Sequence, residues 1–306
     1  MIAIATSAGI ARTAAWLDVP LPKVELSIEV FPPKGPDAAA RLWANLEQFV
    51  AVQPRFISVT CGAGGAGVDG TSPLASAIQD RFGVPVAAHM TCAWSSRDEI
   101  DALARDYWTR GIRRIVALRG DPPKGSERYV PRPDGYAFGA DLIAGLKRVA
   151  DFEINAGCYP EVHPEAASAE ADIDNVRRKV EAGATRLVTQ YCFDTDLILR
   201  FRDRLQAVGI EAEYVPGIMP IHNFTQIKRF SRGCGAGIPA WLEQLFDGVE
   251  EGSPMQGMIA ASIATEQCRR LAAEGLTKMH VYALNRAELP LAIRHMLGTQ
   301  SVAAAA

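Results

Sequence analysis

Short apolar runs alternate with longer amphipathic segments along almost the whole chain. The apolar runs are rich in β-branched residues and predict strands at residues 24–30, 56–60, 84–90, 114–118, 153–157, 186–189, 213–215 and 279–282. The segments between and after them predict helices at residues 37–52, 73–82, 96–110, 140–150, 167–182, 195–207, 223–231, 254–273 and 286–297. This alternation is typical of β/α units around a parallel sheet, and eight predicted strands favour an α/β fold of the closed (β/α)8 TIM-barrel type.

An open, doubly wound sheet is the alternative fold, because strand-helix alternation alone does not distinguish it from a barrel. That fold leads us to expect a G-x-G-x-x-G turn after the first strand, whereas residues 29–33 read EVFPP. Residues 62–67 (GAGGAG) follow the second predicted strand, but they lack this spacing and no helix begins promptly after them. We interpret them as a βα loop.

The organisation of the chain predicts a single domain. Its 306 residues are 48% hydrophobic and contain no long linker, repeat or low-complexity tract. We therefore expect one catalytic barrel domain over residues 1–306, with an N-terminal extension at 1–22 and a loose C-terminus at 300–306. The extension lacks the basic start of a signal peptide and is too short to span a bilayer, so we expect no membrane attachment.

Charge and cysteine usage narrow the function classes further. The net charge is −3 and the basic residues are scattered, so we expect no nucleic-acid partner. The six cysteines form no C-x-x-C pair, which favours a reducing, cytoplasmic location over a disulfide scaffold. Four cysteines follow strands in separate loops without a partner at ligand spacing, so we expect buried thiols and no metal: Cys61, Cys92, Cys158 and Cys192.

Polar residues gather at the predicted C-terminal ends of the strands, where β/α barrels carry their chemistry. The set is Glu29, Thr60, His89, Arg119, Asp121, Tyr159, His163, Gln190, Asn285 and Arg286. Each residue alone also fits a cap, a buried hydrogen bond or a solvated loop, but together they favour a polar active site. No predicted strand ends in a lysine, which argues against Schiff-base aldolase chemistry.

Two features suggest particular roles. Glu29 lies near the end of an apolar strand, where burial without a partner favours the protonated form that a general acid needs; an ion pair inside the barrel is the other interpretation. Asp172, Asn175, Arg178 and Lys179 are spaced to share one stripe of a helix. Such a stripe is either a solvated charged face or a site for a ribose and a diphosphate.

Seven segments, in this order, resemble the bacterial methylenetetrahydrofolate reductase family. They are residues 27–34 (SIEVFPPK), 58–60 (SVT), 88–92 (AHMTC), 118–123 (LRGDPP), 159–164 (YPEVHP), 189–194 (TQYCFD) and 284–288 (LNRAE). The resemblance covers nearly the whole chain after residue 23, and it explains the missing dinucleotide fingerprint, because the barrels of this family bind FAD without a dinucleotide fold.

The resemblance implies that FAD lies across the C-terminal ends of the strands. The implied FAD contacts are Thr60, Cys61, Ala63, His89, Arg119, Gly120, Asp121, Gly139, Tyr159, His163, Ala166, Asp172, Asn175, Arg178 and Lys179. The implied folate contacts are Asp121, Gln190, Gln226 and Arg286, with Phe230 stacking on the bound substrate or nicotinamide. The implied catalytic residues are Glu29 and Asp121.

The activity implied is ping-pong hydride transfer from NADH or NADPH through FAD to 5,10-methylenetetrahydrofolate. Glu29 protonates N10 so that the five-membered ring opens, while Asp121 grips the pterin and tunes the flavin. A barrel methyltransferase acting on methyl-folate and a folate-binding protein without catalysis are the alternatives. We also expect a homo-oligomer.

Overall fold

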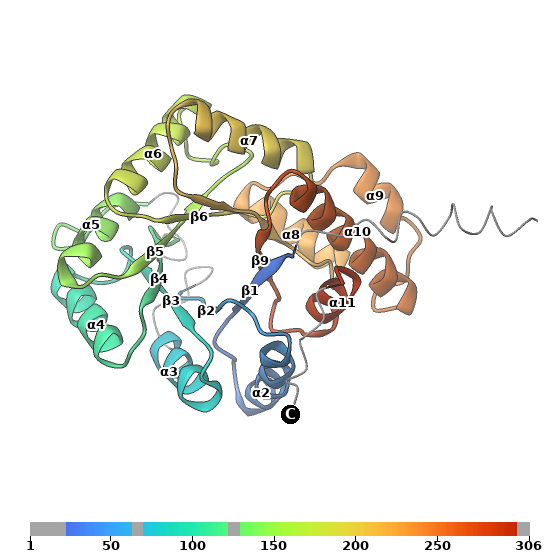
Figure 1. Ribbon diagram of the computed structural model, residues 1–306, viewed down its shortest axis with the longest axis horizontal. Coiled ribbons are helices and arrows are strands. Elements are labelled where there is room, and N and C mark those ends of the chain that lie inside the picture. Colours follow the sequence, from blue (N-terminus) through green and yellow to red (C-terminus); the bar gives the residue numbers. More distant parts are fainter. Residues whose placement is uncertain (1–22, 63–69, 122–128, 299–306) are drawn as a thin grey trace, which may run out of the picture.

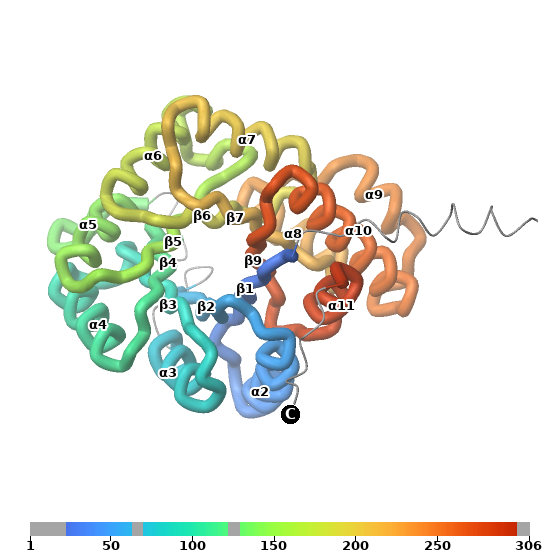
Figure 2. The backbone as a smooth tube through the Cα atoms, viewed as in Figure 1, coloured from blue at the N-terminus to red at the C-terminus, as the bar shows by residue number. Residues whose placement is uncertain are grey.

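A computed structural model describes residues 23–62, 70–121 and 129–298 of the chain. Within these ranges, parallel strands form a ring that is surrounded by helices (Figure 1). The chain advances around this ring in sequence order and returns to pair with its own beginning (Figure 2). The predicted TIM-type barrel is thus confirmed, and the open sheet is excluded. The expected N-terminal extension, the loose C-terminus and Ala63 lie outside the described residues.

Nine strands make up the sheet in the described part of the chain. They are β1 (Glu25–Val30), β2 (Ile57–Val59), β3 (Val86–Thr91), β4 (Arg114–Leu118), β5 (Glu153–Cys158), β6 (Arg186–Thr189), β7 (Glu213–Val215), β8 (Gly217–Ile218) and β9 (Lys278–Tyr282). Their order is β7-β6-β5-β4-β3-β2-β1-β9-β8, and every pair is parallel. All eight predicted strands exist, each within two residues of its predicted bounds.

The prediction of eight strands is wrong by one because the seventh is split. Pro216 separates β7 from β8, and its missing N–H interrupts the ladder of hydrogen bonds. Its carbonyl still accepts from the backbone N–H of His280 at 2.9 Å. Since β7 pairs with β6 and β8 pairs with β9, this one broken segment joins the two ends of the sheet and closes the ring.

The helices form the outer layer. They are α2 (Pro36–Ala51), α3 (Thr71–Phe82), α4 (Arg97–Thr109), α5 (Gly139–Val149), α6 (Ala169–Glu181), α7 (Thr195–Ala207), α8 (Phe224–Cys234), α9 (Ala240–Phe246), α10 (Pro254–Ala273) and α11 (Glu288–Met296). Nine were predicted to within three residues at each end, a normal uncertainty for helix ends. The short α9 was missed, because its seven residues contain only two buried apolar positions, Leu242 and Phe246.

The main hydrophobic core lies between the strands and the helices. Alternate residues of β1, such as Ile28 and Val30, face outward and pack with Leu46 and Phe49 of α2.

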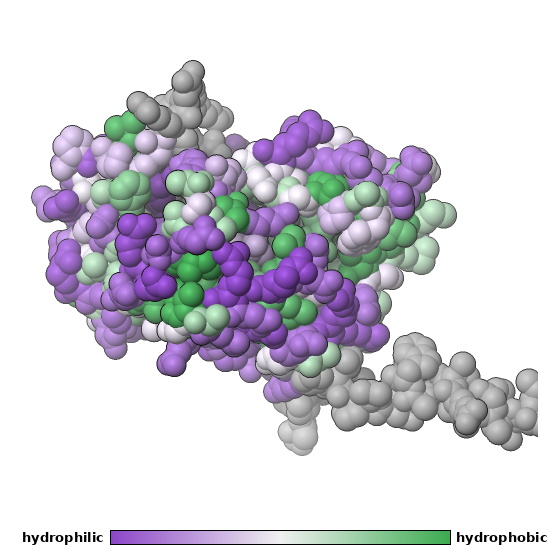
Figure 3. Space-filling model, turned by 90° about the horizontal axis from the view of Figure 1, so that it is seen from above, coloured by the Kyte–Doolittle hydropathy of each residue, from purple (hydrophilic) through white to green (hydrophobic). Residues whose placement is uncertain are grey.

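On the side of the molecule shown in Figure 3, hydrophilic residues cover most of the surface and leave small apolar patches between them. No helix in the described part of the chain is long and apolar enough to cross a membrane.

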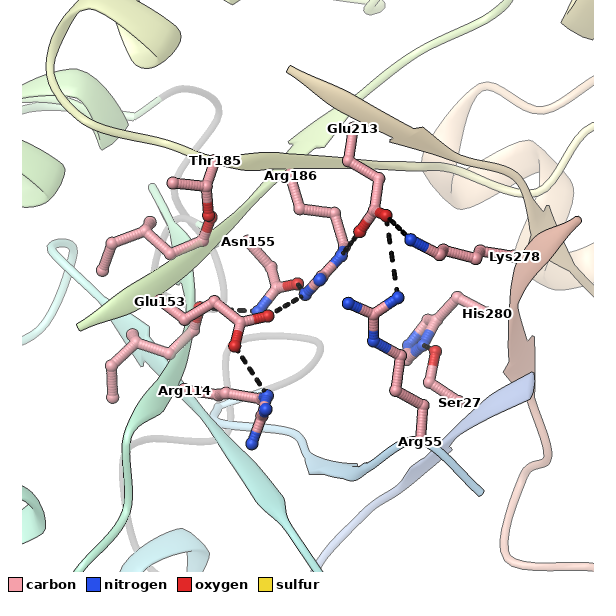
Figure 4. Close-up of polar contacts among 12 residues, drawn as sticks. Ser27, Arg55, Arg114, Glu153, Asn155, Thr185, Arg186, Glu213, Lys278 and His280 are labelled. Atoms are coloured by element: carbon pink, nitrogen blue, oxygen red, sulfur yellow. Dashed lines mark hydrogen bonds and ion pairs between the residues drawn. The ribbon is translucent and has the colours of Figure 1, made fainter. Parts of the chain in front are cut away.

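The inner face of the barrel is largely polar, and its base is closed by ion pairs (Figure 4). Arg186, only 6% exposed, pairs with Glu153 at 2.6 Å and with Glu213 at 2.5 Å. Glu213 also pairs with Lys278 and lies 3.6 Å from Arg55. Because Glu213 is on β7 and Lys278 is on β9, these ion pairs also bridge the two ends of the sheet.

We expect Glu213→Gln to destabilise the barrel in a pH-dependent way. Burial opposes ionisation of Glu213, but Lys278, Arg186 and Arg55 outweigh it and lower its pKa. Its contribution to stability is therefore complete above its unfolded pKa of about 4.3 and is lost as the pH falls through the lower folded pKa. A fully buried pair costs about 3–5 kcal/mol to break; this carboxylate is partly exposed, so we expect a loss of about 2 kcal/mol in the free energy of unfolding at neutral pH.

Urea unfolding at several pH values measures this effect, with Glu25→Gln as the matched control. Glu25 is exposed and reaches one cation, Arg55, at 3.5 Å. Its loss should change stability little at any pH. Equal stability of the Glu213 variant and the wild type at neutral pH would show that the ion pairs do not hold the barrel closed.

Candidate active site

Polar side chains from neighbouring strands meet inside the C-terminal end of the barrel. The register pairs Glu29 of β1 with Tyr282 of β9, and Ser27 with His280 one layer below. Successive side chains of a strand point to opposite faces, so both pairs share the inner face while Ile28 packs outward. This alternation brings residues from the two ends of the chain together.

Glu29 lies between two histidines. Its Oε2 atom is 3.4 Å from Nε2 of His89 and 3.6 Å from Nε2 of His280, and its side chain is 20% exposed. Burial, opposed by the charge of Glu29 and reinforced by His280, lowers the pKa of His89 to about 4. His89 is therefore neutral near pH 7, and it does not neutralise the carboxylate.

Hydrogen bonding assigns a proton to Nδ1 of His280, the ring nitrogen that bonds to Ser27. The Ser27 hydroxyl donates to the carbonyl of Met279 at 3.3 Å, so its oxygen accepts from Nδ1–H of His280 at 2.7 Å (Figure 4). With Nδ1 protonated, Nε2 of His280 is an acceptor, and the Ser58 hydroxyl lies 3.4 Å from it. Oε2 of Glu29 lies slightly farther away, at 3.6 Å, so the imidazole stands beside the carboxyl group without a direct hydrogen bond to it.

Tyr282 forms the adjoining wall. Its hydroxyl donates to the carbonyl of Thr189 at 2.6 Å. Burial, followed by the nearby charge of Glu29, raises the pKa of Tyr282 well above its usual value, so it stays protonated. The sequence analysis did not name Ser27, His280 or Tyr282. Ser27 comes two residues before Glu29 on β1, and His280 and Tyr282 are likewise two residues apart on β9. This two-residue alternation is the signal that could have found them.

A second cluster lies where β4 and β5 end. Arg119 makes a two-pronged ion pair with Glu165, in which its Nη2 lies 3.0 Å from Oε1, and its guanidinium lies 4.8 Å from the centre of the Tyr129 ring. Gly120 has φ of +89°, and a Cβ atom there would lie 2.9 Å from Cβ of Thr91. A glycine is therefore required at this turn, and Glu165 is a further residue that the sequence did not reveal.

The segment after β5 folds back onto α6. The backbone N–H of His163 donates to Asp172 at 3.0 Å, and the rings of Tyr159 and His163 meet edge to face with centroids 4.6 Å apart. Burial, reinforced by the charge of Arg119, lowers the pKa of His163. The backbone N–H of Ala166 donates to the carbonyl of His163 at 2.8 Å, which completes a tight loop.

The four residues of the predicted helical stripe differ in their surroundings. Asp172 is 5% exposed and engaged with the loop, Asn175 is half-buried, and Arg178 is exposed. Lys179 turns inward and donates to the carbonyl of Gly157 at 2.8 Å, and burial lowers its pKa. The stripe is therefore not a uniformly solvated face.

Gly139, at the start of α5, lies close to the Lys179 side chain and to the backbone of Arg119. A Cβ atom there would lie 3.7 Å from Cε of Lys179 and 3.9 Å from the backbone nitrogen of Arg119. Arg119, Gly139 and Lys179 were predicted separately from three segments, and the structure brings them together.

The other predicted residues around the barrel end are also held by local bonds. The carbonyl of Thr60 accepts from the Thr71 hydroxyl at 2.8 Å, and burial raises the pKa of the adjacent Cys61. Gln190 accepts from the backbone N–H of Tyr191 at 3.0 Å and also bonds to the side chain of Tyr159. Asp121 is exposed, three residues after the end of β4.

The remaining predicted residues lie on α8 and after β9. Gln226 is exposed, its backbone N–H is capped by Asn223 at 2.6 Å, and Phe230 packs against the buried cluster that includes Tyr191. Arg286 is exposed, with Nε lying 3.8 Å from Glu288. Exposed polar groups at the rim are suited to contact a ligand from outside the barrel.

The sequence matches known proteins over nearly its whole length. The family model described as methylenetetrahydrofolate reductase matches residues 19–298. The 5,10-methylenetetrahydrofolate reductase of Escherichia coli (strain K12) is 45% identical over 278 residues, which cover 91% of this chain and 92% of that protein. The Salmonella typhimurium protein of the same name is 44% identical with the same coverage.

Two more distant proteins show how far the likeness extends. Methylenetetrahydrofolate reductase (NADH) 1 of Arabidopsis thaliana is 34% identical over 89% of this chain, but the match covers 48% of the plant protein. A solved structure of an uncharacterised Clostridium thermocellum protein that binds two copies of 5-methyl-5,6,7,8-tetrahydrofolic acid has a TM-score of 0.63 at 13% identity, covering 94% of this chain and 99% of that one. It supports the barrel fold. On the family match and the bacterial relatives, this chain belongs to the methylenetetrahydrofolate reductase family.

Proposed function

We propose that this chain reduces 5,10-methylenetetrahydrofolate to 5-methyltetrahydrofolate with NADH or NADPH, using bound FAD. The observation that carries the proposal is a carboxyl group, Glu29, held against His89 and His280 inside the barrel of a reductase-family member. A positioned acid is what opening the methylene bridge requires, because a neutral amine is a better leaving group than an amide anion.

The residues at the ends of β4 and β5 fit a dinucleotide such as FAD. Arg119 and the half-buried Lys179 supply positive charge on the segments next to the start of α5, and the N-terminus of a helix itself attracts a phosphate. FAD, when bound, supplies the hydride transfer between nicotinamide and folate. Arg119, His163, Arg178 and Lys179 would hold its anionic part, and Thr60, Cys61 and Asp121 would line the flavin.

Folate recognition fits the groups at the rim. A pterin presents adjacent N–H donors, which the carboxylate of Asp121 accepts in pairs, while Gln190 offers both a donor and an acceptor. Arg286 is exposed, as an arginine that binds the anionic glutamate tail must be. Gln226 and Phe230 of α8 complete this set, with Phe230 offering an aromatic face for stacking.

Glu29 delivers the proton in this scheme. With its carboxyl proton directed at N10 of the substrate, the C–N10 bond breaks, N10 keeps the bonding electrons and takes the proton, and the one-carbon unit remains on N5. His280, with Nε2 3.6 Å from Oε2 of Glu29, is placed to exchange a proton with this carboxyl group between turnovers. A general acid of this kind typically contributes about 10²–10⁴ in rate.

The test of the proposal is a spectrum followed by an assay. The purified protein, reconstituted with FAD, should be yellow and should form 5-methyltetrahydrofolate from methylenetetrahydrofolate and reduced nicotinamide. A protein that stays colourless but transfers the methyl group of methyl-folate would instead be a methyltransferase. One that binds folate without turnover would be a binding protein, and both results overturn the proposal.

We expect the double variant Arg178→Ala/Lys179→Ala to retain FAD poorly. Two charge-assisted contacts of about 1.5–3 kcal/mol each would be lost, so the Kd for FAD should rise by at least 100-fold. Quenching of flavin fluorescence measures the Kd. Arg177→Ala is the matched control, because Arg177 belongs to the same helix but its guanidinium pairs with Asp174 at 2.6 Å. Equal Kd values for both variants would assign the stripe a structural role.

Location and assembly follow from other features. The six cysteines are all free, which supports a reducing, cytoplasmic location. Exposed apolar side chains of α9 and α10, namely Trp241, Leu245, Met255 and Met258, offer a surface for the expected homo-oligomer.

A further inference from the structure

The connection from β9 to α11 contains an unusual backbone conformation. Leu284 and Asn285 are consecutive, and both have positive φ values, +50° and +58°. Gln53 is the one other non-glycine residue with positive φ in the described ranges. The left-handed region costs a side-chain-bearing residue on the order of 1 kcal/mol or more, so surrounding contacts must hold this turn.

The carboxamide of Asn285 supplies those contacts. Its Oδ1 accepts from the backbone N–H of Phe31 at 2.8 Å, and its Nδ2 donates to the carbonyl of Phe31 at 2.9 Å. A side chain thus satisfies both backbone groups of a residue just beyond the end of β1. In return, Asn45 of α2 donates to the carbonyl of Asn285 at 2.7 Å.

These bonds join the ends of two neighbouring strands that carry site residues. Phe31 follows Glu29 by two residues, and Asn285 follows Tyr282 by three, while Glu29 and Tyr282 are paired in the sheet. Arg286 comes directly after Asn285, and its backbone N–H closes the turn on Ala283 at 2.9 Å. The conformation of Asn285 therefore sets the direction in which both the β1 end and Arg286 leave the barrel.

We propose that Asn285 is a positioning residue for the folate reaction: its carboxamide locks the end of β1, and so Glu29, while its left-handed turn presents Arg286 to the anionic end of the substrate. The proposal rests on the proposed function. It predicts an effect confined to the folate step, because the residues proposed to hold FAD lie on other segments of the barrel.

Two substitutions separate the carboxamide from the turn. Asn285→Gly keeps easy access to positive φ and removes both bonds to Phe31. Asn285→Asp keeps the acceptor and the size of the side chain, but at neutral pH its carboxylate cannot donate to the Phe31 carbonyl. Once protonated, the aspartic acid both donates and accepts, so the pair of bonds can form again.

The experiment measures two rates for the full-length enzyme loaded with FAD: methylenetetrahydrofolate reduction, and NADH oxidation by the artificial acceptor menadione. Near pH 7.5, both variants should lose about 10-fold in kcat/KM for folate, as expected for two neutral hydrogen bonds, and stay within about twofold of wild type with menadione. As the pH falls toward about 4, near the ordinary pKa of an aspartic acid, the Asn285→Asp variant should regain activity relative to Asn285→Gly.

The outcomes separate the two proposals. A wild type that reduces menadione but never folate would contradict the proposed function itself. A wild type active on folate, with a constant ratio of Asn285→Asp to Asn285→Gly at every pH, would overturn the positioning role. If either variant fails to fold, as judged by its thermal unfolding, Asn45→Ala removes only the support of the turn. It should raise the KM for folate about threefold, and an unchanged KM would likewise overturn the role.

Discussion

Replacing Glu29 with glutamine should abolish most folate reduction while leaving NADH oxidation by menadione within about twofold of wild type. Glutamine keeps the length and hydrogen-bonding reach of the side chain but has no proton to transfer. Oxidation of the nicotinamide needs no acid, whereas opening of the methylene bridge does. We expect the folate step to fall by at least about 100-fold, equivalent to roughly 2.7 kcal/mol at the transition state.

Stopped-flow measurement of the two half-reactions tests this separation. Glu25→Gln is the matched control, because Glu25 lies on the same strand at the base of the barrel, where Arg55 lies 3.5 Å away. It should leave both rates unchanged. Equal slowing of both half-reactions by Glu29→Gln would make Glu29 a structural or flavin-positioning residue, and its assignment as the acid would be withdrawn.

The sequence predicts the fold well because the barrel repeats one local pattern. Every strand except β8 carries enough apolar residues to be recognised, and the predicted strand bounds agree with the structure within two residues. β8 has two residues and α9 has seven. These segments are too short for the hydrophobic periodicity of a strand or a helix to be recognised in the sequence. Both elements depend on tertiary contacts: β8 on its pairing with β9, and α9 on the burial of Leu242 and Phe246.

The site was only partly predictable, for a reason that lies in the geometry of the barrel. A search of strand ends finds Glu29, His89 and Arg119, because each lies within one residue of the end of a predicted strand. Ser27 and His280 lie one layer deeper, in the middle of their strands, and their contact spans 253 residues of sequence. It exists only because β9 closes against β1 in one register, and this register is set by packing on both faces rather than by any local motif.

In the Ser27–His280 contact, His280 is the residue that also approaches Glu29. We expect His280→Gln to slow folate reduction by about 10- to 100-fold, with little effect on NADH oxidation by menadione. Glutamine can still hydrogen-bond to Ser27, yet it has no ring nitrogen that could exchange a proton with Glu29, whose Oε2 lies 3.6 Å from Nε2 of His280. Glu29 and His280 would then act as a unit, and residues that act as a unit are strongly non-additive.

A double-mutant cycle measures this coupling directly. Once Glu29→Gln has removed the transferable proton, the further change His280→Gln should cost less than about twofold, whereas independent roles would multiply the two effects. His89→Gln in the same Glu29→Gln background is the comparison, because His89 touches the same oxygen but burial already keeps it neutral near pH 7. Full multiplication of the Glu29 and His280 effects would show that His280 supports the barrel wall and does not take part in proton delivery.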